Sequence, residues 1–84
     1  MERYDPLLHD DAIEALRILR GKDRQAIRGF LDKLWSNPHM IPDTTYTDRK
    51  GRMVSKVRVH RHMVDYIVDD AIREIKVLRI IKLA

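Results

Sequence analysis

Basic side chains two residues apart give this chain its most evident chemistry. Lys56, Arg58 and His60 alternate with apolar residues such as Val57 and Val59. Residues two apart on a β-strand project from the same face, so the pattern predicts a strand with one cationic and one apolar face. Cationic side chains hold phosphate and stabilise the charge that develops in phosphoryl transfer, and histidine transfers protons near neutral pH. The alternative is a solvated face whose charges prevent sheets from associating.

A second interpretation concerns the run His60-Arg61-His62 at the end of this strand. Histidines separated by one strand residue lie on the same side and could form a metal pair, but no third ligand stands at a diagnostic spacing. We therefore expect no metal and no other cofactor. The chain also lacks a phosphate-binding glycine loop and a Ser/His/Asp nucleophile arrangement, so the sequence does not support nucleotide hydrolysis, a hydrolase triad or nicotinamide chemistry.

Length and composition limit the class of protein. The 84 residues predict a single domain, 1–84, with one modest core. The net charge of +4 favours a polyanion or an acidic protein as partner. The chain has no cysteine, which is compatible with a reducing compartment. No apolar run approaches the ~18 residues of a membrane span, and we expect a cytoplasmic protein with no membrane attachment.

Two helices are predicted to precede the basic strand. Asp5-Pro6 predicts the start of the first helix, because Asp caps free N–H groups and Pro suits the first helical position, and Gly21 predicts its end. Asp23 is a candidate cap of the second helix, which Asn37-Pro38 ends. The short joint at Gly21-Lys22 predicts an antiparallel helix hairpin. The second helix carries its apolar residues at helical spacing: Ile27, Phe30, Leu31, Leu34 and Trp35.

The second half of the chain predicts an antiparallel meander. Its three strands are expected at about 52–60, 63–68 and 72–81. A loop around His60-Arg61-His62 and a turn at Asp69-Asp70 separate them, and Tyr46 is a candidate for a further short strand. Helices followed by a meander predict an α+β fold in which an N-terminal helix hairpin covers one face of a small antiparallel sheet. Arg79 is either an exposed strand residue or the partner of Asp65 across the sheet.

The order of these elements resembles the RelE/ParE toxin superfamily, and the resemblance covers nearly the whole chain. The motifs that carry it are Asp5-Pro6, Leu34-Trp35-Ser36-Asn37-Pro38, the Lys56-Val57-Arg58-Val59 strand, Val64-Asp65-Tyr66-Ile67-Val68-Asp69 and Val77-Leu78-Arg79-Ile80. The resemblance implies a RelE-like fold and a compact toxin that a cognate antitoxin, encoded by an adjacent gene, holds inactive.

The two branches of the superfamily imply different targets. RelE-like members cleave mRNA in the ribosomal A site without a metal, whereas ParE-like members poison DNA gyrase. The RNA-cleaving branch implies that Lys56 and Arg58 bind phosphate and that Arg61 and Lys82 support the transition state. His60 or His62 would then transfer protons. The arginine that the family often carries at this hairpin falls on Met63, so Arg61 would replace it.

Three functional hypotheses follow from the resemblance. The first is a RelE-like toxin, a ribosome-dependent mRNA endoribonuclease that inhibits translation, with the ribosome, mRNA and an antitoxin as partners. The second is a ParE-like toxin that binds gyrase without chemistry of its own. The third is an inactive relative that keeps only its antitoxin-binding surface or pairs with itself as a homodimer, because exposed strand edges favour association.

Overall fold

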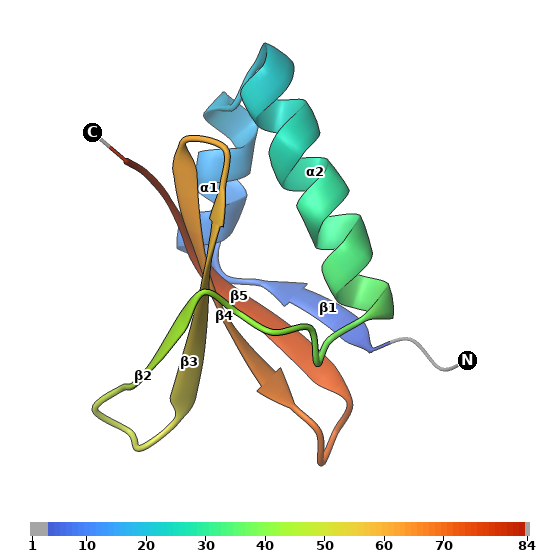
Figure 1. Ribbon diagram of the computed structural model, residues 1–84, viewed down its shortest axis with the longest axis vertical. Coiled ribbons are helices and arrows are strands. Elements are labelled where there is room, and N and C mark those ends of the chain that lie inside the picture. Colours follow the sequence, from blue (N-terminus) through green and yellow to red (C-terminus); the bar gives the residue numbers. More distant parts are fainter. Residues whose placement is uncertain (1–3, 84) are drawn as a thin grey trace.

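Residues 4–83, which the computed structural model describes, form two helices and one five-stranded sheet (Figure 1). In chain order the elements are β1 (Asp5–Leu8), α1 (Asp10–Ile18), α2 (Gly21–Ser36), β2 (Thr44–Thr47), β3 (Met53–Val59), β4 (His62–Asp69) and β5 (Glu74–Lys82). The strands lie in the order β1-β5-β4-β3-β2. Neither helix in the described part is long and apolar enough to cross a membrane. The predicted α+β fold with a helix hairpin on a sheet is confirmed.

The sheet is mixed because its first strand is parallel to β5, and this corrects the prediction that Asp5-Pro6 starts a helix. The backbone N–H groups of Asp5 and His9 donate to the carbonyls of Arg73 and Val77, so odd-numbered residues of this segment face β5. Pro6 therefore points its ring nitrogen to the open edge, where no hydrogen bond is lost. Helix α1 begins only at Asp10, after His9, which makes no side-chain cap.

The joint between the helices lies earlier than predicted. Helix α1 ends at Ile18, and Leu19 and Arg20 connect it to α2, which begins at Gly21 with φ +56°. Glycine suits this backbone conformation because it has no Cβ to clash. Asp23 is therefore inside the first turn of α2 and does not cap it, and its carboxylate is free to bond elsewhere.

The core lies between the two helices and one face of the sheet (Figure 1). The predicted apolar stripe of α2 is buried there, with Trp35 only partly covered. Val57 belongs to this core and Val59 packs against it, so the predicted apolar side of the basic strand is confirmed. Tyr66 is 1% exposed, and its ring lies 6.2 Å from that of Phe30.

Two features of the sheet determine where Tyr46 and Lys82 lie. Tyr46 lies in β2, so the candidate short strand is confirmed, and the third predicted strand begins at Glu74 rather than at 72. The register of β4 and β5 shifts by one residue after Asp65, since Asp65 pairs with Arg79 while Tyr66 pairs with Val77. Such a bulge re-aims the side chains beyond it, and as a result Lys82 of β5 lies opposite His62 of β4.

Candidate functional site

The hairpin that joins β3 and β4 turns on two residues, His60 and Arg61. Val59 pairs with His62, so the predicted three-residue loop is one residue shorter, and His62 is the first residue of β4. His60 has φ +59°, which is in the left-handed region. This region costs an L-residue roughly 1–2 kcal/mol relative to ordinary backbone. The turn therefore holds a strained histidine in a position where hairpins usually place glycine.

The side chains of the turn bind a carboxylate on the first turn of α2. Asp23 Oδ1 lies 2.8 Å from His60 Nδ1, and Asp23 Oδ2 accepts a hydrogen bond of 2.9 Å from Arg61 Nη2. Arg61 Nε also approaches Oδ1, at 3.4 Å. Arg58, the last exposed cation of β3, donates from Nε to the carbonyl of His60 at 3.3 Å. We call these four residues, Asp23, Arg58, His60 and Arg61, the turn site.

The electrostatics of the turn site favour an ionised carboxylate. The hydrogen bonds from Arg61 and then from His60 lower the pKa of Asp23 below its usual range, against a smaller opposing effect of desolvation. The Asp23 side chain is only 16% exposed, whereas those of His60 and Arg61 are 46% and 61% exposed. The carboxylate is thus shielded behind the imidazole and the guanidinium, which both remain accessible to a ligand.

A cavity of about 320 Å³ adjoins the turn site on its helix side. Its charged and polar lining is formed by Arg20, Asp23, His62 and Lys82, and apolar residues of α1, of the connection between the helices and of β5 complete it. His62 is 5% exposed, and its Nδ1 is buried with no hydrogen-bond partner among the described residues. His62 and Lys82 thus face the helices, whereas the turn histidine reaches solvent.

Lys56 belongs to a different environment, on the sheet face that points away from the helices. Its Nζ lies 5.4 Å from the centre of the Tyr46 ring, a cation–π contact, and its backbone pairs with that of Asp65. The Oδ2 atom of Asp65 is 3.3 Å from the Tyr46 hydroxyl and 3.4 Å from Arg79 Nε. Of the two alternatives for Arg79, the pairing with Asp65 is found, and its side chain is also 49% exposed.

The structure divides the six residues predicted to act together into three groups. Arg58, His60 and Arg61 meet at the turn site, His62 and Lys82 line the adjoining cavity, and Lys56 lies on the open face with Tyr46. The alternation of residues along the strand correctly predicts that Lys56 and Arg58 share a face. It does not predict where the side chains of the turn residues lie.

Sequence reasoning missed two contributors to this region, Asp23 and Arg20. The sequence predicts Asp23 as a helix cap, whereas in the structure it binds a histidine 37 positions further along the chain. Arg20 lines the adjoining cavity and is not among the candidate site residues of the sequence. No local pattern pairs a helix carboxylate with a distant hairpin, so no signal in the sequence could have found Asp23.

Within residues 4–83, no three His, Cys, Asp or Glu side chains lie together so as to hold a metal ion. His60 Nδ1 is directed to Asp23, and His62 is buried on the helix side. The two histidines of the metal-pair interpretation therefore occupy unlike surroundings and do not form a shared site with a third ligand.

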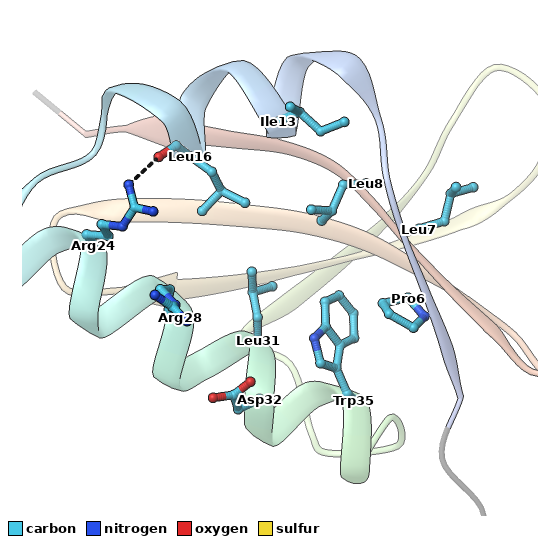
Figure 2. A pocket seen from close by; sticks show the side chains of 10 residues that line it. All are labelled: Pro6, Leu7, Leu8, Ile13, Leu16, Arg24, Arg28, Leu31, Asp32 and Trp35. Carbon is cyan, nitrogen blue, oxygen red and sulfur yellow. Dashed lines mark hydrogen bonds between the residues drawn. The ribbon is translucent and has the colours of Figure 1, made fainter.

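A second concave surface is lined by residues of α1, α2 and β1 (Figure 2). We call it the helix groove, and its volume is about 470 Å³. Figure 2 shows Leu31 and Trp35 of α2 directed toward Leu8 and Pro6 of β1, with Arg28 on the α2 side. Ten residues line the helix groove: Pro6, Leu7, Leu8, Ile13, Leu16, Arg24, Arg28, Leu31, Asp32 and Trp35.

The fold of this chain is that of the RelE toxins. The isolated RelE toxin of E. coli superposes with a TM-score of 0.78 at 17% identity, covering 96% of this chain and 85% of that one. The archaeal RelE–RelB complex from Pyrococcus horikoshii OT3 superposes with a TM-score of 0.75 at 21% identity, covering 94% and 93%.

The RelBE2 toxin–antitoxin complex from Mycobacterium tuberculosis gives a TM-score of 0.68 at 19% identity, covering 96% of this chain and 99% of that one. No protein-family model matches the sequence, and no curated protein matches it. The likeness is thus one of fold, carried by structures that share about a fifth of their residues with this chain.

Proposed function

We propose that this protein is a RelE-like toxin that cleaves mRNA on the ribosome and so inhibits translation. One observation carries the proposal: on a RelE fold, the turn site presents an imidazole bonded to a carboxylate that also binds Arg61, and Arg58 contacts the backbone carbonyl of the same histidine. A base flanked by cations is what cleavage of a phosphodiester by its own 2′-hydroxyl requires.

The proposed reaction is an internal transfer that needs no co-reactant. The 2′-oxygen of the RNA attacks the neighbouring phosphorus, the bond from phosphorus to the 5′-oxygen breaks, and a 2′,3′-cyclic phosphate and a 5′-hydroxyl remain. Nε2 of neutral His60 takes the 2′-hydroxyl proton, and the leaving 5′-oxygen takes a proton from solvent. Arg58 and Arg61 bind the non-bridging oxygens, whose negative charge grows in the transition state.

Regulated expression with mapping of mRNA 5′ ends on ribosomes tests the proposal. The wild-type chain should arrest growth and produce new 5′ ends within ribosome-bound mRNA. His60→Gln should lower cleavage by roughly 10²- to 10⁴-fold, the usual contribution of a general base. Arg49→Ala serves as the matched control, because Arg49 is an exposed cation in the β2–β3 connection, outside the turn site, and it should cleave as the wild type does.

Two results would reject cleavage. Growth arrest with intact mRNA and inhibited DNA supercoiling would assign the chain to the gyrase-binding branch. Harmless expression of a folded protein that still binds the product of the adjacent gene would identify an inactive relative.

The antitoxin is the second partner that we propose, with the helix groove as its docking surface. Solved structures that share this fold include complexes of a toxin with its antitoxin, the RelE–RelB complex of Pyrococcus horikoshii OT3 and the RelBE2 complex of Mycobacterium tuberculosis. The helix groove is apolar along its floor, and Leu7 and Ile13 are each 43% exposed. Arg24 and Arg28 flank it, so it fits an amphipathic segment with acidic residues beside its apolar side.

A charged side chain placed in the helix groove should weaken the binding of this antitoxin. Ile13→Glu should reduce affinity for the protein encoded by the adjacent gene by roughly 10-fold or more, since a buried charge without a partner opposes association. Ile72→Glu is the matched control, because Ile72 is 58% exposed and lies in the β4–β5 turn, away from the groove. Equal affinity of both variants, measured by calorimetry, would remove the helix groove from the proposal.

A further inference from the structure

The bond between Asp23 and His60 determines which imidazole nitrogen carries a proton. An ionised carboxylate can only accept hydrogen bonds. The contact of 2.8 Å between Asp23 Oδ1 and His60 Nδ1 therefore requires the proton on Nδ1, and a neutral ring then keeps a lone pair on Nε2. Because hydrogen bonds of Arg61 and His60 lower the pKa of Asp23, this carboxyl is ionised across the neutral range.

Arg61 holds the Asp23 carboxylate in the position from which it binds the His60 imidazole. Its Nη2 and Nε atoms lie 2.9 and 3.4 Å from the two oxygens of Asp23, so the guanidinium contacts both. A fork of this kind defines the plane of the carboxylate as well as its position. Asp23 also lies on the first turn of a helix of 16 residues, which is a rigid support.

The backbone of the turn contributes the third constraint. His60 keeps a left-handed φ of +59°, although it is not glycine. Strained backbone persists only where the surroundings enforce it, and it concentrates at functional sites. Here the strained residue is the one whose side chain reaches across to α2, so the strain and the hydrogen bond occur at the same histidine.

We propose that Asp23 is a positioning residue, which holds His60 in the Nδ1–H tautomer and directs Nε2 outward as the proton acceptor of the turn site. The consequence for RNA cleavage rests on the proposed function above, whereas the tautomer is a property of the folded protein alone. The arrangement of base and orienting carboxylate follows the general logic of activated catalytic groups, and in this chain the two members come from a hairpin turn and a helix start.

Nuclear magnetic resonance tests the tautomer without any substrate. Long-range ¹H–¹⁵N correlations distinguish a proton on Nδ1 from one on Nε2, and we expect His60 of the wild-type protein to show the Nδ1–H pattern when its ring is neutral. Asp23→Ala should change this pattern toward Nε2–H or exchange between both forms. Asp11→Ala is the matched control, because Asp11 is an exposed carboxylate on the first turn of the other helix, and it should leave the His60 signals unchanged.

Cleavage kinetics separate positioning from a general effect on folding. Asp23→Ala should lower the cleavage rate constant by roughly 10- to 100-fold, with KM for programmed ribosomes changed less than about 3-fold. In a His60→Gln background the same substitution should change the rate less than about 2-fold, because the group that it positions is gone.

The outcomes of these experiments test the positioning role of Asp23 and the proposed cleavage of mRNA separately. An Nε2–H tautomer in the wild type overturns the positioning role, whether or not mRNA is cleaved. Equal rate losses for Asp23→Ala in both backgrounds also overturn it, since a merely structural role predicts that result. A wild-type protein that cleaves no mRNA overturns the proposed function, and the resonance experiment then decides the tautomer independently.

Discussion

At the scale of single residues, Asp65 shows how this small sheet accommodates a charge. The residue is 2% exposed, on the face that the helices do not cover. A buried carboxylate is costly unless partners offset its desolvation. Arg79 and the Tyr46 hydroxyl both contact Oδ2, while Oδ1 is buried without a partner among the described residues. Burial first and the charge of Asp65 second raise the pKa of Tyr46, so the phenol stays a donor.

Removing the cation of this network should destabilise the protein. We expect Arg79→Leu to lower the free energy of unfolding by about 1–2 kcal/mol, because it leaves the Asp65 carboxylate with only the phenol as partner. The Arg79 side chain is 49% exposed, so water screens part of the interaction and keeps the effect modest. Urea denaturation measures the change.

A second substitution tests the cause of that loss. Asp65→Asn combined with Arg79→Leu should recover part of the stability, because a neutral amide has no charge to compensate. Arg49→Leu, at an exposed position, should change stability by less than about 0.5 kcal/mol. If the double variant is less stable than Arg79→Leu alone, the charge of Asp65 is not the source of the effect.

At the scale of elements, the joint between the helices depends on one backbone conformation. Gly21 begins α2 with φ +56°, and a Cβ added there would meet nothing within 4 Å. Gly29 lies in the interior of the same helix, and a Cβ there would also meet nothing within 4 Å. The two glycines thus differ in backbone conformation but not in available space.

Alanine at these two positions should have opposite effects. Gly21→Ala should lower the free energy of unfolding by about 1–2 kcal/mol, the usual cost of a left-handed L-residue. Gly29→Ala should raise it by about 0.5–1 kcal/mol, because glycine in a helix interior loses more conformational freedom than alanine. Thermal or urea unfolding of both variants measures the pair, and a loss at Gly29 equal to that at Gly21 would contradict the conformational explanation.

At the scale of the whole molecule, carboxylates hold distant segments together. Asp70, in the β4–β5 turn, accepts hydrogen bonds from the Tyr4 hydroxyl at 2.6 Å and from His39 Nε2 at 2.7 Å. Asp23 holds the hairpin to α2 in the same way. These bonds lower the pKa of both carboxyls, with Tyr4 the largest cause at Asp70 and Arg61 the largest at Asp23. The segments around Tyr4 and His39 and the β3–β4 turn are therefore attached through ionised groups.

Lowering the pH should decrease the stability of the folded protein, because it protonates these carboxylates. A carboxyl with a lower pKa in the folded state stabilises it above the unfolded pKa of about 3.8, and this contribution is lost as pH falls through the folded pKa. We expect the urea midpoint to fall as the pH drops below about 4, and Asp70→Asn to make that fall shallower. Asp11→Asn, whose carboxylate is exposed on α1, is the control; an equal slope for Asp70→Asn and wild type would refute this account.

The sequence by itself determined what depends on local periodicity. The apolar spacing of α2 specified its buried face, and alternation in the basic strand separated Val57 and Val59 from Lys56 and Arg58. Opposite charges at Asp65 and Arg79 were enough to suggest their pairing, which the sheet register allows. Short-range rules decide such features, because the neighbours involved are set by helix and strand geometry.

Only the tertiary structure decided the features that depend on partners far along the chain. Pro6 lies in a strand because β5 offers an edge on one side and solvent remains on the other, and no local signal outweighs a helix start at Asp5-Pro6. Asp23 binds a histidine 37 residues away instead of capping its helix. The packing of the hairpin against α2 therefore brought His60 and Arg61 onto one carboxylate and left His62 and Lys82 to line a separate cavity.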